Sequence, residues 1–216
     1  MESIEGILRE RDINYICHFT KVGNLESIFR YGLCPRCYLY DEETNPDSEI
    51  VGIVNDQFRY DNHTNASCLS ISFPNSKMFY RFREENDSEW VVILFDAAYI
   101  LRNKNCAFYP TNAASNQVRF QDVSNFQDIL AFQQLFVGDQ ECRQFLLSKD
   151  PTDVQAEVLV FDRIEASSIA RCVVSSDNVK ENLEREFPDY EFLSTQGRWG
   201  VFDDRLNARK NGFEGY

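Results

Sequence analysis

The order of predicted elements identifies this chain as an α+β protein, with a mixed sheet core and short flanking helices. Short apolar runs typical of strands are interleaved irregularly with runs of helical periodicity. Phe (18 residues) and Tyr (10 residues) are abundant, and aromatic side chains suit a half-buried pleated surface. The length of 216 residues suits one domain, and no repeat or Pro/Gly-rich linker divides residues 1–216.

The first elements are a strand at residues 15–20 and a helix at residues 24–31. The strand is rich in aromatic and β-branched residues. The helix has apolar residues at i, i+3 and i+4, with Asn24 as its expected N-cap and Gly32 as its end. Residues 34–65 are acidic, polar and irregular, which predicts a long loop. Loops of such length in a compact domain usually have a function.

The remaining elements keep the same mixture of strands and helices. Pro74 closes one strand, and Asp177 is the expected cap of a late helix. The tail after residue 195 is polar and has no predicted element. Strands are expected at residues 67–73, 90–95, 155–161, 169–174 and 190–195, and helices at residues 76–82, 125–132, 140–147 and 178–187.

Charge and composition narrow the classes of function. The net charge of −13 argues against a protein that binds nucleic acid by non-specific attraction. No apolar run approaches the roughly 18 residues that span a bilayer. The N-terminus is charged and unlike a signal peptide, so we expect a cytoplasmic protein that does not enter the membrane. Its seven cysteines are then expected to be reduced thiols.

Several common site motifs are absent. The glycine-rich loops of Rossmann and P-loop proteins do not occur, nor do GxSxG or HExxH. Cys34 and Cys37 form one CxxC, but no second pair of cysteines or histidines completes a four-ligand zinc site. The CxxC also follows a helix, whereas a redox motif opens one. We therefore expect no structural metal.

Two polar residues in predicted strands have both a structural and a functional interpretation. His18 is either a hydrogen-bonded histidine of a half-buried strand or a ligand contact at its end. Glu157 opens an apolar strand, and ionised groups resist burial unless they are paired. It either points outward by strand alternation or is a functional carboxylate. Strand alternation would place Gln155 on the same face as Glu157, and Thr20 on the same face as His18.

Four blocks, in order, resemble the DarT family of toxin ADP-ribosyltransferases, which modify DNA bases. The resemblance covers residues 15–162, and residues 112–115 onward are similar to a divergent branch of that family. Gln57 and Phe58 depart from the more basic residues that precede the arginine in the best-known members. The blocks are His18-Phe-Thr20-x-x-Gly-Asn24-Leu25 through Tyr31-Gly-Leu33, Asp56-Gln-Phe-Arg59, Ser70-Ile-Ser-Phe-Pro74 with Met78-Phe-Tyr80, and Pro151-Thr-Asp-Val-Gln-Ala-Glu157-Val-Leu-Val160.

The resemblance implies NAD as co-substrate and a role for each matched residue. Glu157 would stabilise the cation-like ribose as nicotinamide leaves. Arg59 would neutralise the NAD phosphates or help to activate the acceptor base, unless it is a solvated surface arginine. Gln155 would orient the acceptor, within reach of a substrate-contacting loop at residues 138–154. The residues implied to bind NAD are His18, Phe19, Thr20, Asn24 and Arg59.

Arg198 is a further candidate substrate contact, found outside the matched blocks. It lies between two glycines and beside Trp199, on which a base could stack. The alternative is ordinary packing of the polar tail. Arg198 is the second candidate for the functional arginine.

The function that the resemblance implies is transfer of ADP-ribose from NAD to a base in single-stranded DNA. Such an enzyme would be the toxin of a toxin–antitoxin or phage-defence system, with a macrodomain-type hydrolase as antitoxin. One alternative keeps the chemistry but uses RNA or protein as acceptor, which the acidic charge favours. Another is a non-catalytic module that binds NAD or ADP-ribose, although binding alone needs no carboxylate beside the ribose.

Overall fold

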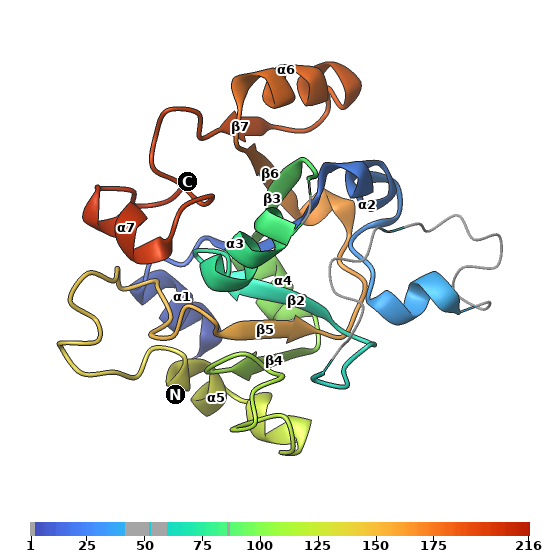
Figure 1. Ribbon diagram of the computed structural model, residues 1–216. Helices are drawn as coiled ribbons and strands as arrows, with labels where there is room; N and C mark the ends of the chain where they lie inside the picture. Colours follow the sequence, from blue (N-terminus) through green and yellow to red (C-terminus); the bar gives the residue numbers. More distant parts are fainter. Residues whose placement is uncertain (1–2, 42–51, 53–59, 86) are drawn as a thin grey trace.

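The computed structural model of this protein describes residues 3–41, 52, 60–85 and 87–216. Within them, seven strands form one sheet in the order β4-β5-β2-β1-β3-β6-β7, with β6 parallel to β7 and the other neighbours antiparallel. Helices flank this sheet (Figure 1), and the predicted α+β class is confirmed. The strands are β1 (Tyr15–Lys21), β2 (Ser67–Ile71), β3 (Trp90–Asp96), β4 (Cys106–Tyr109), β5 (Glu157–Val160), β6 (Ile169–Val174) and β7 (Phe192–Ser194).

Strand β3 is buried on both of its faces. Val91, Ile93 and Phe95 belong to a hydrophobic cluster that includes side chains of α1, α2, α4, α5 and α6. Val92 and Leu94 belong to a second cluster, which includes side chains of α3 and α7. Two-sided burial explains why this segment is continuously apolar instead of alternating. The helices are α1 (Ile4–Glu10), α2 (Leu25–Tyr31), α3 (Ser76–Glu85), α4 (Ala97–Asn103), α5 (Ile129–Gln134), α6 (Asp177–Glu186) and α7 (Arg205–Lys210), with 3₁₀ turns η1 (Val22–Asn24), η2 (Arg36–Tyr40), η3 (Val123–Phe126) and η4 (Ala166–Ser168).

The predicted strands are confirmed, but three of them are shorter than expected. The strand predicted at residues 67–73 ends at Ile71, because Ser72 has a φ of 62° that a strand does not accommodate. The strand predicted at residues 155–161 begins only at Glu157. Gln155 therefore lies in a turn, and the alternation expected to align it with Glu157 does not apply. The last strand covers Phe192–Ser194.

Of the two predicted helix caps, Asn24 is confirmed in position and Asp177 is wrong. Asn24 is the N-cap residue of α2 but makes no capping hydrogen bond with its side chain; its side-chain amide bonds to Thr20 in the preceding strand. The late helix is capped by Ser176 and not by Asp177, because the Ser176 hydroxyl accepts a hydrogen bond from the Val179 amide at 3.3 Å. Gly32 ends α2 as expected, with a φ of 85°.

The middle of the chain holds less helix than predicted. The segment at residues 125–132 is divided into η3 and α5, because Asp128 caps α5 by accepting from the Ala131 amide. The helix predicted at residues 140–147 is absent, and turns occupy this segment. At the end of the segment, the Leu147 amide donates to the side chain of Asp150, whose Oδ2 lies 3.0 Å away.

Four elements were not predicted: α1, α4, β4 and α7. Strand β4 is short and takes its position from pairing with β5. Helix α7 lies in the polar tail, where periodicity of apolar residues is weak. Across the described residues, no helix is long and apolar enough to cross a bilayer.

Candidate active site

The sheet opens between β1 and β2, and a cavity occupies the opening. These strands pair over two residue positions, Ile16 with Ile71 and Cys17 with Ser70. Beyond Cys17, β1 keeps its full ladder with β3 while β2 pairs with β5. The cavity has a volume of about 250 Å³. Its described lining comes from β1, η1, α2, the segment after α2, β2, α3, the loop after β4, and β5.

Glu157 is the buried carboxylate of this cavity. Its side chain is 6% exposed and lines the cavity at the first position of β5. The Asn112 side-chain amide donates to Oε1 at 2.9 Å, and the Ala113 backbone amide donates to Oε2 at 3.0 Å. Each oxygen accepts a bond from a protein donor, which favours the ionised form. The interpretation of Glu157 as an outward-pointing strand residue is wrong.

The strand next to Glu157 gives it a rigid support. Tyr109 of β4 lies directly opposite in the ladder, and its ring stacks on Phe126 with 4.2 Å between the centroids. Burial raises the pKa of Tyr109 to about 12, helped by the charges of Asp61 and Glu157, so the phenol stays neutral near pH 7. Glu157 is therefore paired in the sheet with a residue whose ring is packed against Phe126, and hydrogen bonds fix its carboxylate oxygens.

His18 bridges the gap where the ladder between β1 and β2 stops. Its Nδ1 lies 2.8 Å from the carbonyl oxygen of Cys68. A carbonyl only accepts, so Nδ1 carries the proton and donates this bond. The bond to Cys68 agrees with the structural interpretation of His18, and its position in the cavity wall is compatible with a ligand contact.

Thr20 and Asn24 form a buried polar pair on the same wall of the cavity. The Asn24 amide donates to the Thr20 hydroxyl oxygen at 2.7 Å, and both side chains line the cavity. The bond leaves the Thr20 hydroxyl proton available for an acceptor. Phe19 lines the cavity as well and stacks on Phe79 at 4.7 Å. The predicted NAD-binding residues His18, Phe19, Thr20 and Asn24 therefore meet in one place, together with Glu157.

Two buried polar atoms in the cavity wall have no hydrogen-bond partner among the described residues: Ser67 Oγ and Asn75 Nδ2. Asn75 is 2% exposed, and its Oδ1 already accepts from the Met78 amide at the start of α3. An unmade hydrogen bond on a buried polar group costs about 1–3 kcal/mol, so such groups call for a partner. A polar ligand in the cavity would supply one. Sequence reasoning missed both residues, because neither lies in a recognisable motif.

Arg36 was also missed, and it lines the cavity. It belongs to η2 and lies between the two cysteines of the CxxC, Cys34 and Cys37. Its guanidinium suits the paired oxygens of a diphosphate. Near it, burial raises the pKa of the Cys34 thiol, which keeps that thiol protonated. Among the residues that the structure describes, no group of three potential metal ligands occurs.

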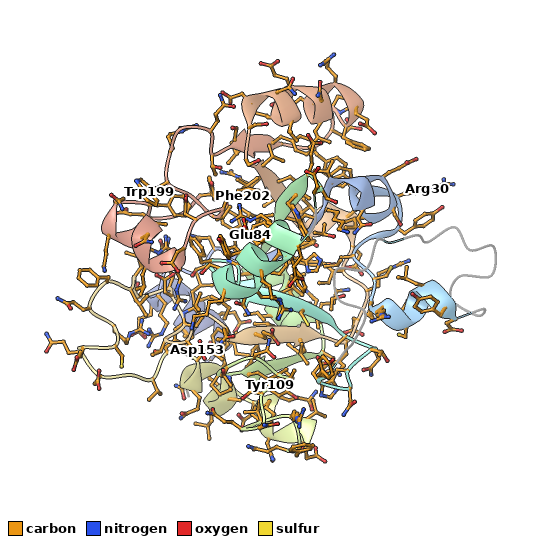
Figure 2. All side chains as sticks on the ribbon, viewed as in Figure 1. Arg30, Glu84, Tyr109, Asp153, Trp199 and Phe202 are labelled. Atoms are coloured by element: carbon orange, nitrogen blue, oxygen red, sulfur yellow. The ribbon has the colours of Figure 1, made fainter. Side chains whose placement is uncertain are left out.

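Of the other predicted site residues, Gln155 and Arg198 are not part of the described cavity lining. Arg59 is outside the described residues. Gln155 lies two residues before β5, and its backbone amide bonds to Asp153. Arg198 is exposed, donates to the Ser194 carbonyl at 3.2 Å, and does not line the described part of the cavity. Figure 2 shows its neighbour Trp199 on the α7 side of the molecule, away from Arg30 of α2.

The split sheet and its fixed carboxylate define a NAD-dependent ADP-ribosyltransferase. The chain belongs to the DarT family: the family model described as "ssDNA thymidine ADP-ribosyltransferase, DarT" matches residues 17–198. The predicted family, enzyme class and NAD co-substrate are confirmed. No protein with a curated description matches the chain.

Solved structures of this family share the fold. Thermus sp. 2.9 DarT in complex with NAD+ has a TM-score of 0.57 at 18% identity, covering 84% of this chain and 94% of that chain. The same protein with ADP-ribosylated ssDNA has a TM-score of 0.58 at 17% identity, covering 85% and 94%. Thermosipho africanus DarTG in complex with ADP-ribose has a TM-score of 0.58 at 15% identity, covering 84% and 50%. This chain thus spans about half the length of that DarTG protein.

Proposed function

We propose that this protein transfers ADP-ribose from NAD to thymidine in single-stranded DNA, with Glu157 as the central catalytic residue. The observation that carries the proposal is the Glu157 carboxylate, buried at a cavity wall and held by two protein donors. Loss of nicotinamide from NAD develops positive charge on the ribose, and a fixed negative group stabilises that charge. Because the carboxylate is already oriented, little reorganisation is needed during the reaction.

The opposite wall of the cavity suits the sugars of NAD. The imidazole of His18 and the hydroxyl of Thr20 line this wall and are suited to bonding ribose hydroxyls, while Asn24 holds Thr20 in place through their 2.7 Å bond. Ser67 and Asn75 offer two further polar atoms that the described residues do not satisfy. Phe19 contributes an apolar surface against which a planar ring can pack.

The phosphates and the acceptor base need different residues. Arg36 at the cavity, and Arg59 by resemblance, would neutralise the NAD diphosphate. Arg59 could instead help to activate the base. Gln155, two residues before Glu157, and the loop at residues 138–154 would contact the acceptor. Arg198 is a weaker candidate for DNA contact, because it lies away from the cavity.

In a cell, a DNA-modifying transferase would be toxic unless it is controlled. We infer a toxin of a toxin–antitoxin or phage-defence system, acting in the cytoplasm as one domain over residues 1–216. A cognate antitoxin, of the macrodomain hydrolase type, would neutralise it. The similarity to DarTG of Thermosipho africanus supports this proposal, because that chain is about twice as long as the part matched here and has room for a second domain.

The test is incubation of the protein with labelled NAD and separate pools of thymidine-containing single-stranded DNA, RNA and protein. We expect label on the DNA alone, and none with Glu157→Gln. Label confined to RNA or protein would keep the chemistry and reject the DNA acceptor. NAD binding without transfer to any pool would support the non-catalytic alternative. Expression of the wild type and of Glu157→Gln in cells tests toxicity, which we expect from the wild type alone.

A further inference from the structure

Helix α7 lies against the loop that leads into the catalytic strand. Figure 1 shows α7 beside this loop, and Figure 2 places Asp153 of the loop between α7 and β5. The Arg205 guanidinium donates to the carbonyl oxygens of Pro151 at 2.9 Å and Thr152 at 3.2 Å. Helix α7 begins beyond residue 198, where the match to the family model ends.

The strongest contact joins Arg209 of α7 to Asp150 of the loop. Arg209 Nε donates to Oδ2 at 2.8 Å and Nη2 donates to Oδ1 at 2.7 Å, and both side chains are buried. Asp150 also accepts from the Ser72 hydroxyl at 2.6 Å and from the Leu147 amide at 3.0 Å. One carboxylate therefore ties together α7, the end of β2 and the loop.

One part of the loop is fixed by hydrogen bonds within the protein, and another part is exposed to solvent. Arg143 donates to the Thr152 hydroxyl at 2.7 Å and to the carbonyl oxygens of Leu147 and Asp150 at 3.2 and 3.1 Å. In contrast, Phe145 is 44% exposed and residues 137–142 are exposed. The exposed residues are thus accessible to a substrate, while the hydrogen-bonded residues set the position of the loop.

The residues of these contacts lie close in the sequence to two residues that line the cavity. Asp150 stands seven positions before Glu157 in the sequence, and Ser72 stands two positions after Ser70, which lines the cavity. A shift of Asp150 would therefore displace the loop relative to the carboxylate. Misplacement of a substrate by about 1 Å can reduce a rate about a hundredfold.

We propose that α7 positions the loop at residues 139–153 for the acceptor, with Arg205 and Arg209 as positioning residues that do not contact NAD. The proposal rests on the DNA-directed function above. Neither arginine lines the described cavity, so the NAD site keeps its structure when the loop moves. Their influence is expected on the acceptor step alone.

The test uses Arg205→Lys and Arg209→Lys in the full chain, since lysine keeps the charge but loses the fork of donors. Arg83→Lys is the matched control, because Arg83 donates to the carbonyl of Phe202 at 2.6 Å and has no contact with the loop. Three quantities are measured: NAD affinity, steady-state transfer to a thymidine-containing oligonucleotide, and hydrogen exchange of the loop amides.

We expect both variants to fold and to keep the NAD affinity of the wild type. Hydrogen exchange should rise in residues 139–153, and KM for the oligonucleotide should increase about tenfold, within the range that misplacement produces. The control Arg83→Lys should match the wild type in loop hydrogen exchange and in KM for the oligonucleotide. Unchanged loop exchange, or NAD affinity that falls together with transfer, would overturn the positioning role. A wild-type protein that modifies no oligonucleotide would instead reject the proposed function, and the exchange data alone would then decide the positioning role.

Discussion

At the residue scale, the catalytic proposal depends on how Glu157 is buried. A carboxylate at the start of an apolar strand is compatible with an outward position, and the sequence alone leaves that alternative open. The structure shows two donors from residues 112 and 113, which lie 45 and 44 positions away. Those donors come from a loop after β4, a strand that the sequence did not predict.

Glu157→Gln is expected to abolish transfer with only a modest loss of stability. Removal of one electrostatic contact to a transition state typically costs about a hundredfold or more in rate. The glutamine NH₂ group would face either the Asn112 amide or the Ala113 amide, so the free energy of unfolding should fall by about 1 kcal/mol. Single-turnover transfer and urea unfolding measure the two effects. A variant that transfers at the wild-type rate would remove Glu157 from the mechanism.

Asn75→Asp separates two roles of one side chain. Aspartate still accepts from the Met78 amide, so the start of α3 and the melting temperature should be preserved. The cavity loses the Nδ2 donor and receives a charged oxygen in its place. NAD affinity measured by calorimetry should fall about tenfold, the value of a lost hydrogen bond in a buried site. Unchanged affinity in a folded variant would show that Asn75 does not face the ligand.

At the scale of elements, the parting of β1 from β2 creates the site. The two strands share a ladder of two residue pairs, and His18 continues the connection with its side chain where the backbone pairing stops. Gly32 supports this arrangement from α2: a Cβ there would lie 2.3 Å from the Ile164 carbonyl oxygen. Any larger residue would therefore displace Leu33 and Cys34, which line the cavity.

The contact between α7 and the loop gives a pH-dependent contribution to stability. Burial raises the pKa of Asp150, but the hydrogen bonds and charge of Arg209 outweigh it, so the pKa lies below the ordinary value of 3.8. A lowered folded-state pKa stabilises the protein above the unfolded pKa, and this stability is lost as pH falls through the folded pKa. We expect wild type to lose stability steeply as pH falls below about 4.

Asp150→Asn checks this assignment. The variant leaves Arg209 buried without its counter-charge, so at pH 7 the free energy of unfolding should fall by about 3 kcal/mol. At low pH the wild-type carboxyl is itself protonated, and the two proteins should converge. Urea unfolding of both proteins from pH 7 to pH 2 measures the difference. If the free energies of unfolding of the two proteins changed in parallel from pH 7 to pH 2, a carboxyl other than Asp150 would cause the loss of stability in acid.

At the scale of the whole molecule, the protein has a net charge of −13, and its proposed DNA substrate is also negatively charged. Long-range repulsion opposes DNA binding, and contacts at the cavity have to compensate for it locally. Each phosphate neutralised on a single strand contributes about −0.7 to the slope of log K against log salt. Few such contacts are expected here.

Salt should therefore affect KM for the oligonucleotide weakly. We expect a slope smaller in magnitude than about 2 between 50 and 200 mM salt, corresponding to fewer than about three phosphate contacts. A basic DNA-binding protein loses affinity far more steeply over this interval. Steady-state kinetics with one oligonucleotide at several salt concentrations measure the slope. A steep slope would reveal a basic DNA-binding surface that the net charge conceals.

The sequence by itself determined the fold class, the main strands and the family, because these depend on local periodicity and on blocks of adjacent residues. Strands at residues 15–20, 90–95 and 169–174 follow from such patterns. It also placed His18, Phe19, Thr20, Asn24 and Glu157 in one site through resemblance. The structure brings these five side chains to one cavity.

Only the tertiary structure decided what depends on contacts between distant segments. Ser67, Asn75 and Arg36 come from separate segments and meet at the cavity, which no local pattern encodes. The helix expected at residues 140–147 gives way to turns, and the Leu147 backbone bonds to the side chains of Asp150 and Arg143. The polar tail forms helix α7, in which Arg209 is buried against the Asp150 carboxylate 59 positions earlier. A local sequence pattern reports the preference of a segment, whereas partners far along the chain determine which preference prevails.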